Sequence, residues 1–396
     1  MTLLNSSSIT RLASILLVVG FFYSCASSKV NIDALVANND YKAAFSQIDK
    51  ELAKNPNQPT LYYQKAIING RLATDVSPAQ RAPLYTSLVE ALDTTRELGS
   101  DNPELIEKSD SLAHEYWLSE YNKGISSYET DFKNGSYEET IAHANNAIIL
   151  NNNDIKGYKL LSVAQYNNNQ IDAAIITLND ARVNVENEAA IFEDLGFLYL
   201  EIGNAEESAY YYSLANTNLV KNKNVAFGLV NAYIAADDNA NALDLLNQLA
   251  STYPKDAQIH NVYGTQLYKE TCNLFEQLTI AYNLNDSNKV EDLKVEIEVV
   301  SELAEQQLIK AYKSDMANVE FIESLAVFYN NMAGNYFSQL KTIFEDDAEE
   351  TQKKALNLVD FAISYYSKLS DIYTHNEQAE LKLVALNKLK STWAIE

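Results

Sequence analysis

The sequence has 396 residues, of which 47% are hydrophobic, and its 54 acidic and 30 basic side chains give a formal net charge of −24. This charge argues against binding to nucleic acid and against adsorption to an anionic membrane surface, since both need cationic groups on the protein. The length allows several sub-domains or one extended array, and the small numbers of glycine (11) and proline (6) favour helices over loops.

The first residues have the pattern of a secretory signal peptide. A single cation, Arg11, precedes the apolar run LASILLVVGFF, which is too short to span a membrane comfortably and is typical of a signal-peptide core. The run leads into FYSCASSK, where Ser24 and Cys25 resemble the lipobox of bacterial lipoproteins, although Phe22 replaces the usual aliphatic residue. An ordinary secretory signal or an uncleaved anchor is the alternative interpretation.

The lipobox resemblance implies a defined processing and location. In bacterial lipoproteins the signal peptide is removed and the cysteine is lipidated, for example with palmitate. We therefore expect a signal peptide over residues 1–24 and a lipidated Cys25 with a short tether over 25–30. Ala26 is not the Asp of the inner-membrane retention signal, so the resemblance favours an outer-membrane lipoprotein of the bacterial cell envelope. Lipidation would leave Cys272 without a disulfide partner, as a small buried hydrophobe.

Residues 31–103 have the pattern of helical hairpins. In DYKAAFSQIDKELAKNPNQP the apolar spacing predicts a helix with Ala44 and Ile48 on its buried face, and TLYYQKAIING begins the next hairpin. Between Gly70 and Pro103 the stretch TDVSPAQRAP predicts a longer loop.

A repeat of 34 residues begins further along the chain. Gly135, Asn169, Gly203 and Asp237 are each 34 positions after the previous one, and Gly, Asn and Asp most readily adopt the left-handed conformation that ends a helix. Gly203 would therefore divide the segment DLGFLYLEIGNAEESAYYYSLA into two antiparallel helices. Small and large residues recur at the same offset, which allows paired helices to approach closely.

The residues that recur at this offset resemble those of the tetratricopeptide repeat (TPR) family, most fully over residues 189–222. The resemblance implies an all-α fold, a right-handed α-solenoid of antiparallel helical hairpins, with a regular TPR array over 104–257. Pro254 occupies the closing proline column of the family. The matching signature residues of this repeat are Phe192, Leu195, Gly196, Tyr199, Gly203, Ser208, Tyr212 and Ala215.

The last third of the chain departs from the regular repeat. Apolar periodicity runs from about 258 to 284, and helical patterns then span about 288–313, 318–343, 348–373 and 377–393. These helices are longer than those of a standard TPR. We expect residues 258–396 to form long hairpins that continue the array, with the last helix as its cap.

No catalytic or metal-binding pattern is present in the sequence. His114, His143, His260 and His375 are scattered and lack metal-ligand spacing, and no nucleophile elbow, P-loop or Gly-rich dinucleotide turn occurs. We therefore expect a non-enzymatic protein without a cofactor or a metal ion.

The TPR resemblance implies a candidate binding groove, since the first helix of each repeat lines the concave face of such domains. An exposed apolar stripe there would mark a binding site. The alternative is that the N-terminal hairpins or a long C-terminal helix of the same chain cover the stripe. The residues at the groove positions are Ile125, Phe132, Lys159, Val163, Tyr166, Phe197, Leu200, Phe227, Ile234 and Tyr268.

Three functions are compatible with these features. The first is a lipid-anchored envelope scaffold that binds protein or peptide partners, as TPR lipoproteins of outer-membrane assembly, secretion or transport do. The second resembles the TPR lipoproteins that accompany TRAP transporters and carry a small hydrophobic ligand. The third is a SusD-like glycan-binding lipoprotein, although this sequence lacks the long insertions that carry the sugar site of that family. None of them involves nucleic acid.

Overall fold

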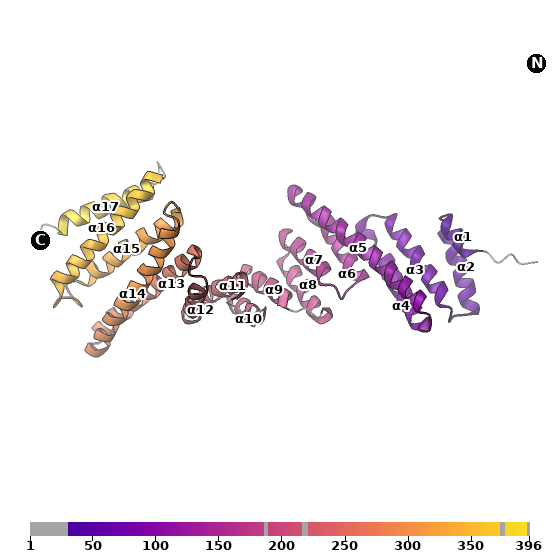
Figure 1. Cartoon of the computed structure of the whole chain (residues 1–396), viewed down its shortest axis with the longest axis horizontal. Helices are drawn as coiled ribbons and strands as arrows, with labels where there is room; N and C mark the ends of the chain where they lie inside the picture. Colours follow the sequence, from indigo (N-terminus) through magenta and orange to yellow (C-terminus); the bar gives the residue numbers. More distant parts are fainter. Residues whose placement is uncertain (1–30, 186–188, 216–220, 373–376, 394–396) are drawn as a thin grey trace, which may run out of the picture. The chain divides into compact units, whose positions relative to one another are not determined.

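The computed structural model describes residues 31–185, 189–215, 221–372 and 377–393, and these residues form helices and connecting turns without a β-strand (Figure 1). They divide into two compact units, which are described separately. The first unit contains residues 31–77 and 83–113, and the second contains residues 78–82 and the chain from 114 onward. The boundary expected at residue 103 lies at the start of a helix, α5 (Pro103–Asn134), and the chain passes from one unit to the other within this helix.

The first unit contains short helical hairpins, as the sequence predicts. Ala44 and Ile48 are fully buried in its core, which also contains Leu61 and Ile68. Asn39 has a φ of 60° and reverses the chain between the first two helices. The helices of this unit before α5 are α1 (Ile32–Ala37), α2 (Tyr41–Lys54), α3 (Pro59–Thr74) and α4 (Ala82–Leu98).

The regular repeat of the second unit has a period of 34 residues. The first helices of three successive hairpins begin at Ile155, Ala189 and Lys223. The helices are α6 (Glu138–Leu150), α7 (Ile155–Asn167), α8 (Ile171–Asn184), α9 (Ala189–Glu201), α10 (Ala205–Ala215), α11 (Lys223–Ala235) and α12 (Asn239–Thr252).

Left-handed residues end the first helices, which confirms the interpretation of the repeat. Gly135, Asn169, Gly203 and Asp237 all have positive φ, between 58° and 77°. At Gly203 the turn is closed by the backbone N–H of Asn204, which donates to the carbonyl oxygen of Tyr199 at 2.9 Å. The equivalent bonds one repeat earlier and one repeat later are both 2.8 Å long. This closure satisfies carbonyl groups that the end of the helix would otherwise leave unpaired.

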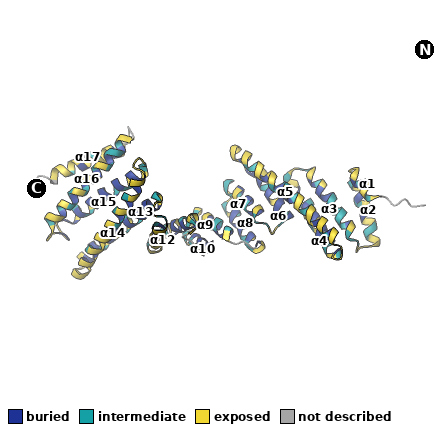
Figure 2. Cartoon of the chain, in the orientation of Figure 1, coloured by how far each residue is buried: buried dark blue, intermediate teal, exposed yellow. Residues whose placement is uncertain are grey.

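Close packing between neighbouring hairpins depends on glycine. The ring of Tyr212 lies between α9 and α11, and a Cβ atom added to Gly196 would lie only 2.8 Å from this ring, while one added to Gly228 would lie closer still. Ser208 donates a hydrogen bond to the carbonyl oxygen of Gly196 at 2.7 Å. The small residues of the repeat are therefore required by helix approach. One apolar core extends from α7 into the C-terminal helices, and buried residues lie between the paired helices (Figure 2).

The long C-terminal hairpins agree with the expected helical stretches. Each has a hairpin partner in the sequence, α13 with α14 and α15 with α16, while α17 follows α16. The segment 340–347 forms turns, so α15 ends a few residues before the position that the sequence indicated. Their bounds are α13 (Ala257–Asn283), α14 (Ser287–Ser314), α15 (Val319–Gln339), α16 (Ala348–Ile372) and α17 (Glu377–Trp393). The fold therefore defines an all-α protein of the TPR type, with regular hairpins followed by long ones.

Candidate functional site

The groove residues expected from the sequence lie on successive first helices. We call the ten residues together the first-helix stripe. They are Ile125 and Phe132 on α5, Lys159, Val163 and Tyr166 on α7, Phe197 and Leu200 on α9, Phe227 and Ile234 on α11, and Tyr268 on α13.

The centre of the stripe is an open apolar patch on α7 and α9. Val163 and Phe197 are each 40% exposed, although both are large apolar side chains. The rings of Tyr166 and Phe197 meet edge to face with their centroids 5.2 Å apart. Together these side chains surround a pocket of about 60 Å³, whose other lining residues are Ser162, Leu178, Asp194 and Leu198. This pocket has room for roughly two water molecules, or for a small apolar group of a partner.

Charged groups surround this patch. The Nζ atom of Lys159 lies 2.9 Å from Asp194 Oδ2, so the cation of the stripe is already neutralised by a neighbouring helix. The Tyr166 hydroxyl donates to Glu201 Oε2 at 3.0 Å, and this hydrogen bond raises the pKa of Tyr166 above its usual value. The patch thus has an apolar centre, with polar side chains held in fixed positions around it. Protein interaction surfaces commonly have this composition.

The two ends of the stripe differ in exposure. On α5, Ile125 is 41% and Phe132 is 67% exposed, whereas Leu200, Phe227 and Ile234 are half-buried. At the other end, α15 packs over Tyr268, whose hydroxyl accepts a hydrogen bond from Asn331 Nδ2 at 2.6 Å. The ring of Tyr268 also contacts Phe328 edge to face at 5.7 Å. The sequence left open whether the stripe is exposed or is covered by another part of the same chain. The chain covers the end at Tyr268, while the α5, α7 and α9 portion contains strongly exposed apolar side chains.

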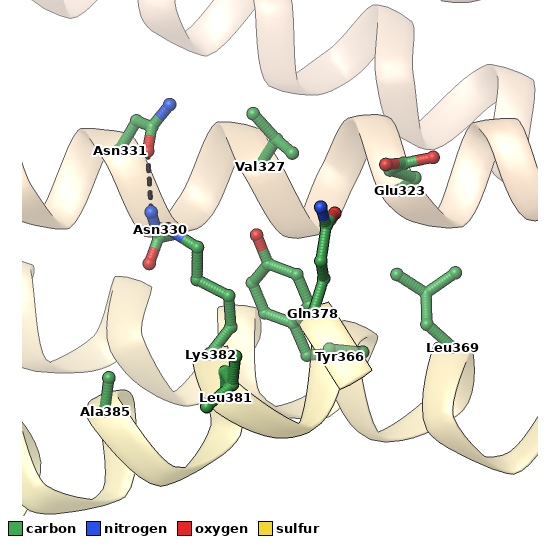
Figure 3. Close-up of a pocket in the computed structure, with 11 residues that line it drawn as sticks. Glu323, Val327, Asn330, Asn331, Tyr366, Leu369, Gln378, Leu381, Lys382 and Ala385 are labelled. Carbon is green, nitrogen blue, oxygen red and sulfur yellow. Dashed lines mark hydrogen bonds between the residues drawn. The ribbon is translucent and has the colours of Figure 1, made fainter. Parts of the chain in front are cut away.

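A second opening lies in the C-terminal hairpins and was not foreseen from the sequence. A groove of about 610 Å³ runs between α15 and α17, with Tyr366 and Leu369 of α16 among its lining residues (Figure 3). Its walls carry the amide side chains of Asn330 and Asn331, and Asn330 donates to Asn331 Oδ1 at 2.6 Å. They also carry one acidic side chain, Glu323, and one basic side chain, Lys382. Three consecutive helices form this groove, and its opening depends on how they pack, so no local motif could have indicated it.

One of the four histidines, His143, lies in a buried polar network with Glu120. His143 Nδ1 lies 2.7 Å from Glu120 Oε2, and the other carboxylate oxygen accepts from Arg81 at 2.7 Å. Asn146 donates to the same carboxylate at 3.2 Å and to the carbonyl oxygen of Pro78 at 2.9 Å. This arrangement holds the segment 78–82 against α5 and α6. No local pattern in the sequence indicates this network, because its members are distant in the chain.

The remaining histidines differ in their surroundings. His260 is also buried, with its ring nitrogens near Gln307 Oε1 at 2.7 Å and the carbonyl oxygen of Pro254 at 3.0 Å. His114 is exposed, while His375 lies outside the described residues. In the part of the chain that the structure describes, no group of three or more His, Cys, Asp or Glu side chains is arranged to hold a metal ion.

The expected lipidation site, Cys25, lies outside the described residues, as do the signal-peptide and tether segments over residues 1–30. Cys272 is a free cysteine and is half-buried on α13. Among the described helices, none is both long and apolar enough to cross a membrane.

No family model matches the sequence, and no curated protein matches it. Solved structures with a similar fold include Pseudomonas aeruginosa pilF, which is 13% identical with a TM-score of 0.43 and covers 70% of this chain and 99% of its own. The C-terminal part of a TPR repeat-containing protein from Cytophaga hutchinsonii is 13% identical with a TM-score of 0.37, covering 89% and 98%. The TPR2AB domain of yeast Sti1, in a complex with pHSP90, is 16% identical with a TM-score of 0.23, covering 68% and 98%. The TPR architecture of the present chain is defined by its own 34-residue hairpins.

Proposed function

We propose that this protein is a non-enzymatic scaffold whose first-helix stripe binds a segment of a protein partner. The observation that carries this proposal is the open apolar patch formed by Val163, Tyr166 and Phe197 on two successive repeats. Apolar side chains of this size normally lie in the core, and a contiguous exposed group of them is typical of an interaction surface.

The size of the pocket favours a protein segment over a free hydrophobic ligand. Pockets that enclose small molecules typically have volumes of about 300–1,000 Å³, whereas the apolar pocket beside Phe197 measures about 60 Å³. A partner side chain could enter such a shallow pocket while the rest of its segment lies along the helices. For the first-helix stripe we therefore propose a protein or peptide partner rather than the cargo of a carrier. The aromatic residues of the patch lie on helices rather than on an exposed loop, which does not favour a SusD-like glycan site.

We further propose that the scaffold acts in the bacterial cell envelope, anchored to the outer membrane by a lipid on Cys25. The support is the signal-peptide pattern and the lipobox-like sequence before Ala26. A role in outer-membrane assembly, secretion or transport would follow from that location. Cys25→Ser should prevent processing and release the protein from the detergent phase in a phase-partition experiment. Unchanged partitioning of this variant would contradict the proposed lipid anchor. It would not bear on the proposed binding surface.

The binding surface can be tested by comparing an exposed and a buried residue of α9. Leu195 is fully buried, so Leu195→Ala should cost about 2–5 kcal/mol of unfolding free energy through lost burial and a residual cavity. Phe197→Ala should cost clearly less, because the ring is 40% exposed, and should weaken partner binding by about 1 kcal/mol or more. Thermal unfolding and co-purification from solubilised envelopes would measure the two effects on the same variants.

A matched control is available on a second helix of the repeat. Ile176 of α8 is 62% exposed and lies outside the stripe, so Ile176→Ala should leave partner binding unchanged. A photo-crosslinking phenylalanine in place of Phe197 should give a discrete crosslinked partner, and the same probe at Ile176 should not. If Phe197→Ala unfolds as readily as Leu195→Ala, or if both probes give the same products, the stripe is not the binding surface.

A further inference from the structure

The last described helix, α17, has one packed side and one open side. Ala379 and Leu386 are 2% and 4% exposed and belong to the core that includes α16. On the other side, Leu381 is 71% and Val384 is 69% exposed. The side of a helix that faces water is normally polar. This helix instead presents two large aliphatic side chains, one of which, Leu381, is labelled at the open groove in Figure 3.

The open side of α17 has the spacing of a helix-pairing seam. Glu377, Leu381, Val384 and Lys388 follow one another at intervals of four, three and four residues, which places them along one face of the helix. The two apolar residues lie in the middle of this seam, and opposite charges lie at its ends. Both charged residues are exposed, and within the described residues neither forms an ion pair. In contrast, Lys390, outside the seam, is paired with Asp360 of α16 at 2.5 Å.

We propose that the seam of α17 pairs antiparallel with the same seam of a second copy of this chain. In this register Leu381 lies opposite Val384 of the second copy, and Glu377 lies opposite Lys388 of the second copy. The two-fold axis of such a pair repeats each contact, because residue i meets j and j meets i. The pair therefore contains two apolar layers, each closed at its outer end by an ion pair. A parallel pair would instead place Glu377 against Glu377 and Lys388 against Lys388, so the charge pattern selects the antiparallel arrangement.

The seam covers a short stretch of one helix, so the dimer should be weak and reversible, as small interfaces generally are. Both copies carry a large negative charge, and physiological ionic strength reduces the repulsion between groups more than about 8 Å apart. Sedimentation velocity of the full chain at this ionic strength, from about 1 µM to about 200 µM, should show a concentration-dependent monomer–dimer equilibrium. Leu381→Ser should abolish the dimer and preserve the helical circular dichroism, because this side chain is exposed in the monomer.

Charge exchange tests the register directly. Glu377→Lys alone, or Lys388→Glu alone, places like charges opposite one another at both ends of the pair and should weaken dimerisation about tenfold. The double variant Glu377→Lys/Lys388→Glu should recover the original affinity. An equimolar mixture of the two single variants should also recover it, because each end of the mixed dimer again joins opposite charges. The matched controls Glu349→Lys and Lys353→Glu make the same charge changes on α16 and should leave the dimer unchanged.

Three results would overturn the proposal. The first is a chain that remains monomeric at about 200 µM, and the second is a dimer that the single variants and their controls weaken equally. The third is a failure of the double variant and of the mixture to recover affinity. Phe197→Ala, which addresses the first-helix stripe, should not alter this equilibrium. Failure of the proposed partner-binding function and failure of this dimer are thus distinguishable.

Discussion

The regular hairpins and the long C-terminal hairpins use the same antiparallel pairing but differ in where the chain may turn. In the regular region a residue with positive φ follows the first helix of each hairpin, as at Gly203 and Asp237. One period later the sequence has Thr271, a β-branched residue, and α13 continues through this position. Its hydroxyl donates to the carbonyl oxygen of Leu267 at 2.8 Å within the helix. The length of a hairpin is therefore set by whether the chain supplies a residue that tolerates the left-handed conformation.

The two regions also differ in what fills the space between helices. In the regular region glycine allows the ring of Tyr212 to pack against two first helices. In the long region Gly264 also lies close to Leu308 of α14, but the contacts among α13, α15 and α16 are made by larger side chains, such as Phe328, Tyr329 and Tyr336, which pack with other aromatic rings. Changes at equivalent residue types should therefore have different effects in the two regions.

A large effect is expected from ionising Tyr212, a buried tyrosine of the regular region. Burial, assisted by nearby Glu193 and Asp194, raises the pKa of Tyr212 to about 12, whereas an unfolded tyrosine titrates near 10. The neutral hydroxyl thus contributes stability that is complete below pH ~10 and is lost as the pH rises through about 12. When the pH rises from ~9 to ~12, the unfolding free energy of Tyr212→Phe should fall by about 2 kcal/mol less than that of the unmodified chain. Denaturant unfolding at several pH values measures this; parallel pH profiles would contradict it.

The second prediction compares two glycines that lie within helices. Gly228→Ala places a Cβ atom against the Tyr212 ring and should destabilise the protein by about 1–3 kcal/mol. Gly334→Ala on α15, where a Cβ atom would meet nothing within 4 Å, should stabilise it by about 0.5–1 kcal/mol through helix propensity. The melting temperatures of the two variants measure both effects, and a Gly228→Ala variant that is as stable as the unmodified chain would show that close helix approach does not depend on glycine at 228.

The third prediction concerns the turn itself. Gly203→Val forces a β-branched residue into a φ of 77° and should cost about 1–2 kcal/mol, although the position has open space around it. Because a Cβ atom at Gly203 would meet nothing within 4 Å, the cost comes from the backbone alone. An unchanged melting temperature would mean that the turn relaxes to another conformation.

The smallest effect is expected from placing a glycine at Asp237, which is the residue equivalent to Gly203 in the next repeat. Asp237 has a φ of 58° and carries a Cβ atom in a conformation that glycine adopts freely. Its carboxylate, however, pairs with Lys269 at 2.9 Å, and this exposed ion pair is of small value. Asp237→Gly should therefore raise the unfolding free energy by up to about 1 kcal/mol. A clear loss of stability would show that the ion pair outweighs the backbone strain.

The candidate site was predictable to the extent that it follows the repeat. The offset of 34 residues placed Val163, Tyr166 and Phe197 on equivalent faces of their helices, and the structure brings these side chains together. Whether each position is open could not be read from the offset, since Tyr268 has an equivalent place in its repeat and is nevertheless covered by α15. Exposure depends on which later helix packs over a residue, and the repeat does not carry that information.

The sequence by itself determined the 34-residue hairpins and the residues at which their first helices end. This is possible because apolar periodicity and left-handed residues such as Gly203 act over a few positions of the chain. Only the tertiary structure decided the contacts between distant segments, of which the buried Arg81, Glu120 and His143 network and the open seam of α17 are examples. The physical reason is that burial of a polar or apolar group depends on every element packed around it, whereas the conformation of a turn depends mainly on the residues within it.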